Sequence, residues 1–284
     1  FDDYNYSYIY TVNRSGIKRF VDNETYHFLE NIKASHADEL EQIVGYSNFD
    51  LLINNENGQI IFYEENSLGD LVTDAIRNLT KTEIAIINSA FIEDNIKRGN
   101  ITYNNILNTL KYSSKIIIKE MKGKDILDAL EFGVQSLPNK NWKFLQVSGI
   151  KFKVDETIKS PIITDKYENF VKIDGERRIY DVYLGEEKLD ENRIYKIAID
   201  DYIAYGGGGY SMINNYKVIN DSILVDSEIL KIFIENNLNG IIPDIYNSTQ
   251  GRIVKKKKET NILNCSSFIK YFKDFSLISF ALLL

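Results

Sequence analysis

The sequence is poor in the residues that build metal and redox centres. Its 284 residues include two histidines, one cysteine and three prolines. The lone Cys265 excludes a disulfide within the chain and any site with several thiolate ligands. A two-metal phosphatase centre needs several His, Asp and Asn ligands that hold its cations roughly 3.5 to 4 Å apart. His27 and His36 both lie in one charged N-terminal stretch. We therefore expect no metal site and no catalytic residue in this chain.

Signatures of other hydrolases are missing as well. The sequence contains no Gly-x-Ser-x-Gly turn for a serine nucleophile and no phosphate-binding loop of the Walker type. The formal charge of −7 argues against nucleic-acid binding, because the phosphate backbone attracts basic surfaces. An anionic ligand would need cations or backbone amides placed locally.

Material for a sizeable core is abundant. The chain is 44% hydrophobic and 26% charged, which is typical of a soluble globular protein, and it contains 19 tyrosines and 15 phenylalanines. Apolar residues that recur three and four positions apart predict helices over 25–44, 68–79, 101–110, 126–134 and 227–236. Short apolar or alternating runs predict strands over 60–63, 83–87, 115–121, 144–155, 179–184 and 195–199.

The order of these elements indicates the fold class. Helices and strands mix without strict alternation, which favours an α+β fold with a mixed β-sheet flanked by helices. Asn66 or Ser67 is expected to cap the helix over 68–79, because its first amides need an acceptor.

Four consecutive glycines follow the last predicted strand. They occupy 206–209, directly after the segment Asp200-Asp201-Tyr202-Ile203-Ala204-Tyr205 and before Tyr210. Glycines let a backbone approach a ligand closely and adopt positive φ, and a tyrosine offers a ring face to a base. A flexible turn after a strand would have the same composition, so the motif alone leaves both interpretations open.

A series of motifs, taken in order, resembles one family. The series comprises Glu65-Asn66-Ser67-Leu68-Gly69-Asp70-Leu71, Asn88-Ser89, Gly99-Asn100-Ile101-Thr102, Met121-Lys122-Gly123-Lys124-Asp125, Phe144-Leu145-Gln146-Val147-Ser148-Gly149, Leu189-Asp190, Tyr195-Lys196-Ile197-Ala198, the tyrosine and glycine segment, and Gly251-Arg252-Ile253. Together they resemble the C-terminal domain of 5'-nucleotidases over about residues 40 to 254.

The resemblance implies a function and a set of site residues. In that family an N-terminal metallophosphatase domain holds two divalent metals, and the C-terminal domain binds the nucleoside between two aromatic rings. The rings fall on Tyr112 and Tyr202, the turn asparagine on Asn88, and the glycine loop on Gly206, Gly207 and Gly208. The chain is thus expected to bind a nucleoside or nucleotide, as part of a hydrolase of extracellular nucleotide catabolism, and to lack the catalytic metal centre.

Three positions depart from the family pattern. Glu64 and Glu93 stand where the family has ligand-binding arginines, and Gly208 stands where it has an aspartate. A carboxylate repels phosphate, and the guanidinium fork is lost. A second interpretation therefore stays open, in which the chain is a degenerate, non-catalytic surface glycoprotein or binding module. The chain has only two histidines, which argues against a third interpretation, in which it is an active phosphatase by itself.

The ends of the chain carry their own signals. Residues 1–39 are expected to be a linker and the remnant of an upstream domain, 40–254 the conserved domain, and 255–284 a basic tether and an apolar tail. Small residues near Asn264 and Ser266, a mixed spacer over 268–274 and ten mostly apolar residues over 275–284 resemble a GPI-attachment signal, and a packed terminal helix is the alternative. Sequons suit an extracellular or cell-surface location; they begin at Asn5, Asn13, Asn23, Asn78, Asn100, Asn220, Asn247 and Asn264.

Overall fold

The computed structural model describes residues 8–12, 18–56, 58–221 and 224–256. The helices in this part are α1 (Asn23–Ser35), α2 (Ala37–Leu40), α3 (Ser67–Thr80), α4 (Tyr103–Thr109), α5 (Gly123–Gly133), α6 (Asp201–Ala204), α7 (Ser211–Asn214) and α8 (Asp226–Ile232). The strands are β1 (Tyr8–Val12), β2 (Lys18–Asp22), β3 (Ile43–Ser47), β4 (Asn54–Asn55), β5 (Gly58–Gln59), β6 (Ile84–Asn88), β7 (Gly99–Thr102), β8 (Ile116–Lys122), β9 (Leu145–Ser148), β10 (Lys151–Asp155), β11 (Ile162–Thr164), β12 (Phe170–Ile173), β13 (Ile179–Leu184), β14 (Glu187–Lys188), β15 (Ile194–Asp200), β16 (Val218–Asn220) and β17 (Ile253–Lys256). Short 3-10 turns span Ser89–Phe91, Gly207–Gly209 and Asp244–Asn247, and a π-helical turn spans Phe233–Asn237.

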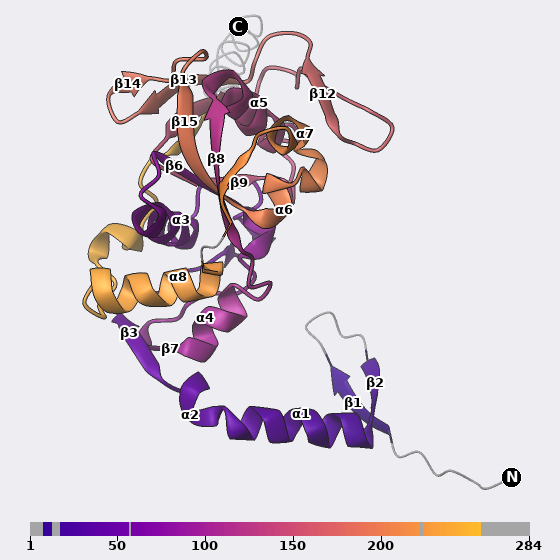
Figure 1. Ribbon diagram of the computed structural model, residues 1–284, viewed down its shortest axis with the longest axis vertical. Coiled ribbons are helices and arrows are strands. Elements are labelled where there is room, and N and C mark those ends of the chain that lie inside the picture. Colours follow the sequence, from indigo (N-terminus) through magenta and orange to yellow (C-terminus); the bar gives the residue numbers. More distant parts are fainter. Residues whose placement is uncertain (1–7, 13–17, 57, 222–223, 257–284) are drawn as a thin grey trace, which may run out of the picture.

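A five-stranded mixed sheet lies at the centre of the body (Figure 1). Its strand order is β16-β8-β15-β6-β9; β15 runs parallel to β6, and the other pairings are antiparallel. Residues of α5 pack on one face, and residues of α3 and α8 pack on the other. The mixed sheet flanked by helices that the sequence predicts is therefore confirmed.

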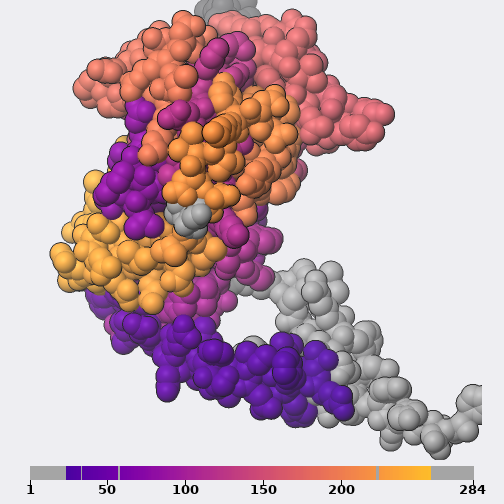
Figure 2. Space-filling view, viewed as in Figure 1, coloured from indigo at the N-terminus to yellow at the C-terminus, as the bar shows by residue number. Residues whose placement is uncertain are grey.

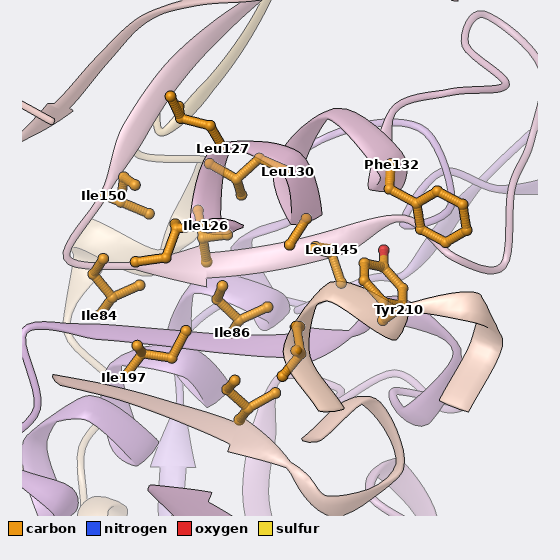
Figure 3. Packing of buried hydrophobic residues seen from close by; sticks show 14 of the residues in the cluster. Ile84, Ile86, Ile126, Leu127, Leu130, Phe132, Leu145, Ile150, Ile197 and Tyr210 are labelled. Carbon is orange, nitrogen blue, oxygen red and sulfur yellow. The ribbon is translucent and has the colours of Figure 1, made fainter. Parts of the chain in front are cut away.

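Alternate residues of β6 face two separate halves of the core. Ile84 and Ile86 pack with the apolar face of α5 (Figure 3), whereas Ala85 and Ile87 pack with α3 and α8. Side chains alternate along a strand, so a strand covered on both sides needs an apolar residue at every position. This explains the unbroken apolar run that predicted the strand.

The first turn of α3 is seated on β9 by two polar side chains. Asn66 caps the helix as expected, since its Oδ1 accepts the backbone N–H of Leu68 at 3.0 Å and of Gly69 at 3.3 Å. The buried Gln146 of β9 accepts the N–H of Asn66 at 3.0 Å. A Cβ added at Gly69 would lie 2.6 Å from Gln146, so only glycine permits this approach.

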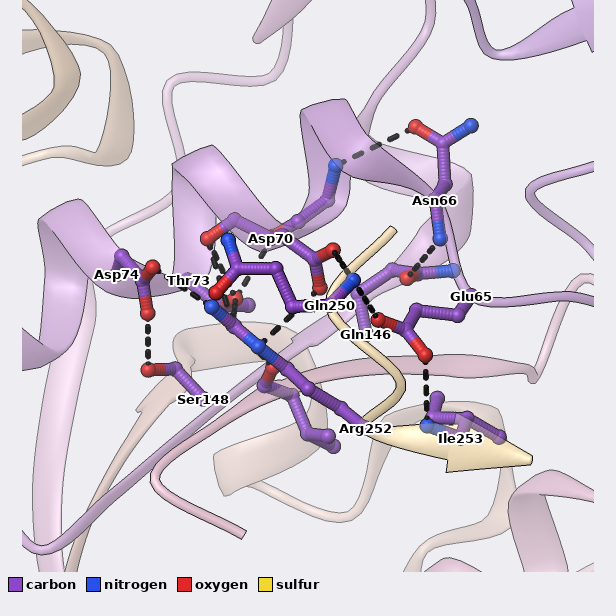
Figure 4. Close-up of polar contacts among 12 residues, drawn as sticks. Glu65, Asn66, Asp70, Thr73, Asp74, Gln146, Ser148, Gln250, Arg252 and Ile253 are labelled. Atoms are coloured by element: carbon purple, nitrogen blue, oxygen red, sulfur yellow. Dashed lines mark hydrogen bonds and ion pairs between the residues drawn. The ribbon is translucent and has the colours of Figure 1, made fainter. Parts of the chain in front are cut away.

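A second sheet joins the end of the described chain to α3. Its order is β14-β13-β10-β17, with β10 and β17 parallel. The carboxylate of Glu65 accepts the backbone N–H of Gln250 at 2.7 Å and of Ile253 at 2.8 Å (Figure 4). Arg252 reaches α3 and donates to Asp74 Oδ2 at 2.6 Å. These contacts fix β17 against the body of the domain.

The N-terminal arm, which we define as the segment from α1 to α2, differs from the single helix predicted over 25–44. The first helix ends at Ser35, a short second helix follows, and β3 begins at Ile43 because this segment pairs with β7. On α1 the apolar side chains of Phe28, Leu29 and Ile32 are exposed. Figures 1 and 2 show the arm projecting from the body.

Three other predicted boundaries also change. The strand predicted over 60–63 does not form. These residues make a turn after β5, and Ile61 is apolar because it is buried in the core. The run over 144–155 is two strands, because Gly149 with φ of 81° turns the chain between them. The helix predicted over 227–236 is α-helical to Ile232 and continues as the π-helical turn.

In the described ranges, no helix has both the length and the apolar character needed to cross a bilayer. Asn264, Ser266 and the apolar tail over 275–284 lie outside the described residues. The lipid attachment predicted for them, and with it the cell-surface location, stays a prediction.

Candidate functional site

The turns after β6 and β15 lie side by side at one edge of the central sheet, because the two strands are parallel. Asn88 ends β6, and its fully buried side chain accepts the N–H of Ala90 at 2.9 Å. Asp200 ends β15, and its carboxylate accepts the N–H of Asn88 at 3.0 Å and of Ile203 at 3.0 Å. One buried carboxylate therefore holds both turns in place.

This carboxylate should make stability depend on pH. Burial raises the pKa of Asp200 to about 7, whereas an unfolded aspartate titrates near 3.9. Folding then takes up a proton between about pH 4 and pH 7, so stability is greatest at the acid end of this window and falls as the pH rises through it. We expect urea titrations to show a loss of up to about 1.4 kcal/mol per pH unit for such a group, and a shallower slope in Asp200→Asn.

Asp226, whose pKa burial also raises to about 7, adds to the same slope in both proteins. Asp174→Asn changes an exposed ion pair with Lys172 and serves as the control, because it should leave the slope intact. If Asp200→Asn and the wild type lose stability equally between pH 5 and pH 7.5, the assignment of a protonated Asp200 is wrong.

The glycine loop is shaped by the tyrosine that precedes it. A Cβ on Gly207 would lie 2.5 Å from the carbonyl oxygen of Tyr202 and 2.6 Å from its ring, so the ring packs directly on the loop backbone. Gly206 and Gly208 have φ of 84° and 67°, which favours glycine over every residue with a Cβ. The run of glycines is therefore required by a close approach at Gly207 and by positive φ at Gly206, Gly208 and Gly209, where φ is 92°.

A buried lysine binds the backbone on both sides of this loop. Lys119 of β8 donates from Nζ to the carbonyl oxygen of Ala204 at 2.6 Å and of Ile213 at 3.1 Å, near the ends of α6 and α7. Cations are favourable at helix C-termini, where carbonyls lack partners. Burial lowers the pKa of Lys119. No motif marks this residue in the sequence, where it stands next to Glu120 in a strand that also contains Lys122.

Tyr112 and Tyr202 lie at this edge of the sheet and are joined by a third ring. The ring centroid of Phe91 is 5.2 Å from that of Tyr112 and 5.6 Å from that of Tyr202, with interplanar angles of 40° and 53°. Tyr112 is 58% exposed and Tyr202 is 42% exposed, so both present ring surface to solvent. Phe91, Tyr112 and Tyr202 form what we call the aromatic cluster. The sequence pattern gives no sign of the role of Phe91.

Trp142 extends the cluster beyond the glycine loop. A Cβ on Gly208 would lie 3.2 Å from the Trp142 ring and 3.5 Å from the ring of Tyr202. The indole is about half exposed, and Lys143 Nζ lies 5.3 Å from its centroid. A side chain at position 208 would thus lie against both rings and would require a small shift of the indole.

The two acidic residues at the expected arginine positions both pair with lysines. Glu93 pairs with Lys111 Nζ at 3.2 Å, and it accepts a hydrogen bond from the Tyr112 hydroxyl that raises the pKa of this phenol. Glu64 pairs with Lys255 Nζ at 3.1 Å. Each of these carboxylates thus has a lysine beside it, but Lys255 also pairs with Glu156 at 3.5 Å, so the negative charge at Glu64 is only partly compensated.

Gln146 connects the Glu64 segment to the site. Its Nε2 donates to the carbonyl oxygen of Glu64 at 2.9 Å and to Ser89 Oγ at 3.3 Å, beside Asn88. The positions singled out in the sequence at Glu64, Asn88, Glu93, Tyr112 and Tyr202 therefore belong to connected segments. The side-chain amide of Gln146 links these segments, and this role follows from the tertiary structure.

The described part of the chain offers no ligand set for a metal. Within it, no group of three or more His, Cys, Asp or Glu side chains is placed to hold an ion. His27 and His36 are exposed on the N-terminal arm. The residues present do not fit a two-metal centre, so no chemical step through metals is assigned to them.

Comparison with known sequences identifies the fold of this site. Residues 44–215 match the family described as "5'-nucleotidase, C-terminal domain". A 5'-nucleotidase of Vibrio parahaemolyticus is 25% identical over 199 residues, which cover 68% of this chain and 32% of the relative. A trifunctional nucleotide phosphoesterase of Bacillus subtilis is 25% identical over 261 residues, covering 87% of this chain and 16% of the relative.

Solved structures agree with the sequence match. A 5'-nucleotidase precursor from Thermus thermophilus superposes with a TM-score of 0.67 at 21% identity, over 88% of this chain and 49% of that one. The NAD nucleotidase of Haemophilus influenzae superposes with a TM-score of 0.62 at 17% identity, over 87% and 48%. The chain spans about a third of the first curated relatives and about half of these structures. It belongs to the family of 5'-nucleotidase C-terminal domains.

Proposed function

We propose that this chain is the substrate-binding part of a 5'-nucleotidase-family hydrolase and that the aromatic cluster binds the base of a nucleoside or nucleotide. One observation carries the proposal: Tyr112 and Tyr202 expose ring surface beside a glycine loop, at the carboxyl ends of two parallel strands. In open parallel sheets ligands bind outside the carboxyl ends of the strands, and β6 and β15 form one such parallel pair in this mixed sheet. Base–aromatic stacking contributes about 1–3 kcal/mol per base.

In this proposal the chain binds and a different part of the protein hydrolyses. Cleavage of the phosphate ester belongs to a metallophosphatase domain with two divalent metals, against which this chain holds the nucleoside. The names of the relatives, 5'-nucleotidase and NAD nucleotidase, support a nucleotide as substrate. Extracellular nucleotide breakdown is the setting that the proposal assigns to the whole protein.

Isothermal titration of the chain with adenosine and with AMP tests the proposal. Adenosine is expected to bind saturably, because stacking needs only the flat base. AMP is expected to bind no more tightly than adenosine, since Glu64 and Glu93 offer carboxylates where a phosphate needs cations. Absence of heat with both ligands would contradict the proposal.

A second candidate is a degenerate binding module that no longer accepts nucleosides. It is favoured by Phe91, whose ring contacts both tyrosines, and by Glu93, which engages the Tyr112 hydroxyl. Aromatic pairs contribute about 0.5–1.5 kcal/mol each beyond the area they bury, so a base inserted between the tyrosines must replace two such contacts.

Phe91→Ala tests whether this ring obstructs the site. Removal of the ring is expected to raise the affinity for adenosine roughly tenfold, because the base no longer competes with two aromatic contacts of about 0.5–1.5 kcal/mol each. Titration calorimetry measures the change, with Phe28→Ala on the N-terminal arm as the control. Weaker binding by Phe91→Ala would mean that Phe91 is itself a wall of the site, and an unchanged affinity would remove it from the site.

A further inference from the structure

A hollow of about 400 Å³ lies away from the aromatic cluster, at the opposite end of β6. Its lining includes Arg77, Ser148, Lys151, Glu186, Gln250 and Arg252. Along β9, Leu145 pairs with Asn88 at the cluster end, whereas Ser148 pairs with Ala85 at the end that faces the hollow. Three residues of strand separate the two ends by about 10 Å. The hollow is therefore a separate place on the domain.

Arg77 is held in a defined orientation at the wall of this hollow. Its Nε donates to Ser148 Oγ at 2.7 Å, and Ser148 is fully buried. The stem of Arg77 passes Gly149, where an added Cβ would lie 2.9 Å from Arg77 Cδ. Across the described ranges, no hydrogen bond or ion pair engages its terminal nitrogens. A guanidinium fixed through Nε, with both terminal nitrogens available, is preorganised for two parallel hydrogen bonds to an oxyanion.

The carboxylate of Asp74, one turn before Arg77 on α3, is already engaged by three donors. Asp74 Oδ1 accepts from Ser148 at 2.5 Å, and Oδ2 accepts from Arg252 at 2.6 Å (Figure 4). Oδ2 also accepts from the Tyr246 hydroxyl at 2.9 Å. Asp74 therefore compensates Arg252 and leaves the charge of Arg77 without a carboxylate partner. In a chain of net charge −7, this is a local excess of positive charge.

Two further donors line the same hollow. Gln250 Nε2 is buried and has no hydrogen-bond partner among the described residues. Lys151 Nζ pairs only loosely with Glu186, at 3.7 Å, and the side chain of Glu186 is 98% exposed. Exposed ion pairs of this kind contribute about 0–1 kcal/mol, so an incoming anion can take the place of Glu186. A buried unpaired donor, by contrast, gains a hydrogen bond when a ligand arrives.

We propose that this hollow binds a small oxyanion, a phosphate or a carboxylate group, with Arg77 as its main ligand and Lys151 and Gln250 as supporting donors. Arg77 supplies the two terminal nitrogens, Lys151 a mobile ammonium, and Gln250 the unpaired amide. The site is independent of the aromatic cluster and does not depend on nucleoside binding there.

Two-dimensional NMR of the arginine Nε–H signals tests the site with inorganic phosphate and, separately, with succinate. Ionic strength is kept constant with sodium chloride, because bulk screening alone shifts such signals. The signal of Arg77, identified by its absence in Arg77→Gln, is expected to shift saturably with at least one probe. Calorimetry should show binding at least tenfold weaker in Arg77→Gln and in Arg77→Lys, which keeps the charge but not the fork.

Lys151→Gln alters a half-exposed side chain and gives a second test if substitution of Arg77 impairs folding. It too should weaken binding, whereas Arg98→Gln, an exposed control in a distant loop, should not. A preference for phosphate or for succinate supports the proposal and identifies the ligand group. The proposal is overturned if neither probe gives a saturable shift, or if Arg77→Gln and Lys151→Gln bind as the wild type does.

Discussion

Tyr202→Ala is expected to weaken adenosine binding by roughly 5- to 150-fold, since a base stacked on an aromatic ring contributes about 1–3 kcal/mol. Tyr202 presents 42% of its surface to solvent and packs on the backbone of Gly207. Tyr202→Phe keeps the ring face and should bind as the wild type does, because stacking does not use the hydroxyl. Titration calorimetry with the three proteins measures the effect.

The same series needs a check on the loop and a surface control. Loss of the Tyr202 ring also removes a packing contact of the glycine loop, so thermal melts must show that Tyr202→Ala is folded. Tyr167→Ala removes a ring that is 72% exposed in the connection between β11 and β12 and should leave the affinity unchanged. A folded Tyr202→Ala that binds adenosine like the wild type would exclude Tyr202 from the site.

Arg252→Ala is expected to lower the free energy of unfolding by about 3–5 kcal/mol, because removal of one partner strands buried charges and acceptors. The Arg252 side chain is only 11% exposed and binds Asp74, Thr73 and the carbonyl oxygen of Val147, with Asp70 at 3.4 Å. Burial already raises the pKa of Asp70 to about 8, and the Arg252 charge opposes that rise. At neutral pH Asp70 is therefore mostly protonated, and the charge that loses its ion pair with Arg252 is that of Asp74. Urea titration at neutral pH measures the loss.

An exposed ion pair provides the matched control for this prediction. Lys97 and Asp50 lie 3.2 Å apart with both side chains largely solvated, so Lys97→Ala should cost at most about 1 kcal/mol. If Arg252→Ala cost no more than Lys97→Ala, the network shown in Figure 4 would not be what holds β17 against α3.

The parts of the fold that local pattern determines were predictable. The helix over 68–79 has apolar residues at spacings of three and four and a capping asparagine, and it appears as α3 with Asn66 as its cap. The strand β6 has an unbroken apolar run from Ile84 to Ile87, and β8 begins with one from Ile116 to Ile118, because both faces of the sheet are covered. The predicted boundaries are wrong where a single residue turns the chain, as at Gly149, and where an element begins because it pairs with a strand distant in sequence, as at Ile43.

The candidate site was predictable only in part. Resemblance indicated Tyr112 and Tyr202, but Phe91 follows no period or motif, and its importance comes from contacts with residues 21 and 111 positions away. Lys119, Gln146 and Asp200 act through hydrogen bonds to loops that are distant in sequence. Such roles depend on tertiary neighbours, which no local pattern encodes.

The most direct measurement is an NMR search for nuclear Overhauser effects between the base protons of bound adenosine and the side chains of the folded chain. Binding at the aromatic cluster predicts contacts from the adenine H2 and H8 protons to the ring protons of Tyr112 and Tyr202. Contacts confined to any other surface, or no binding at millimolar adenosine, would contradict a nucleoside site at these rings.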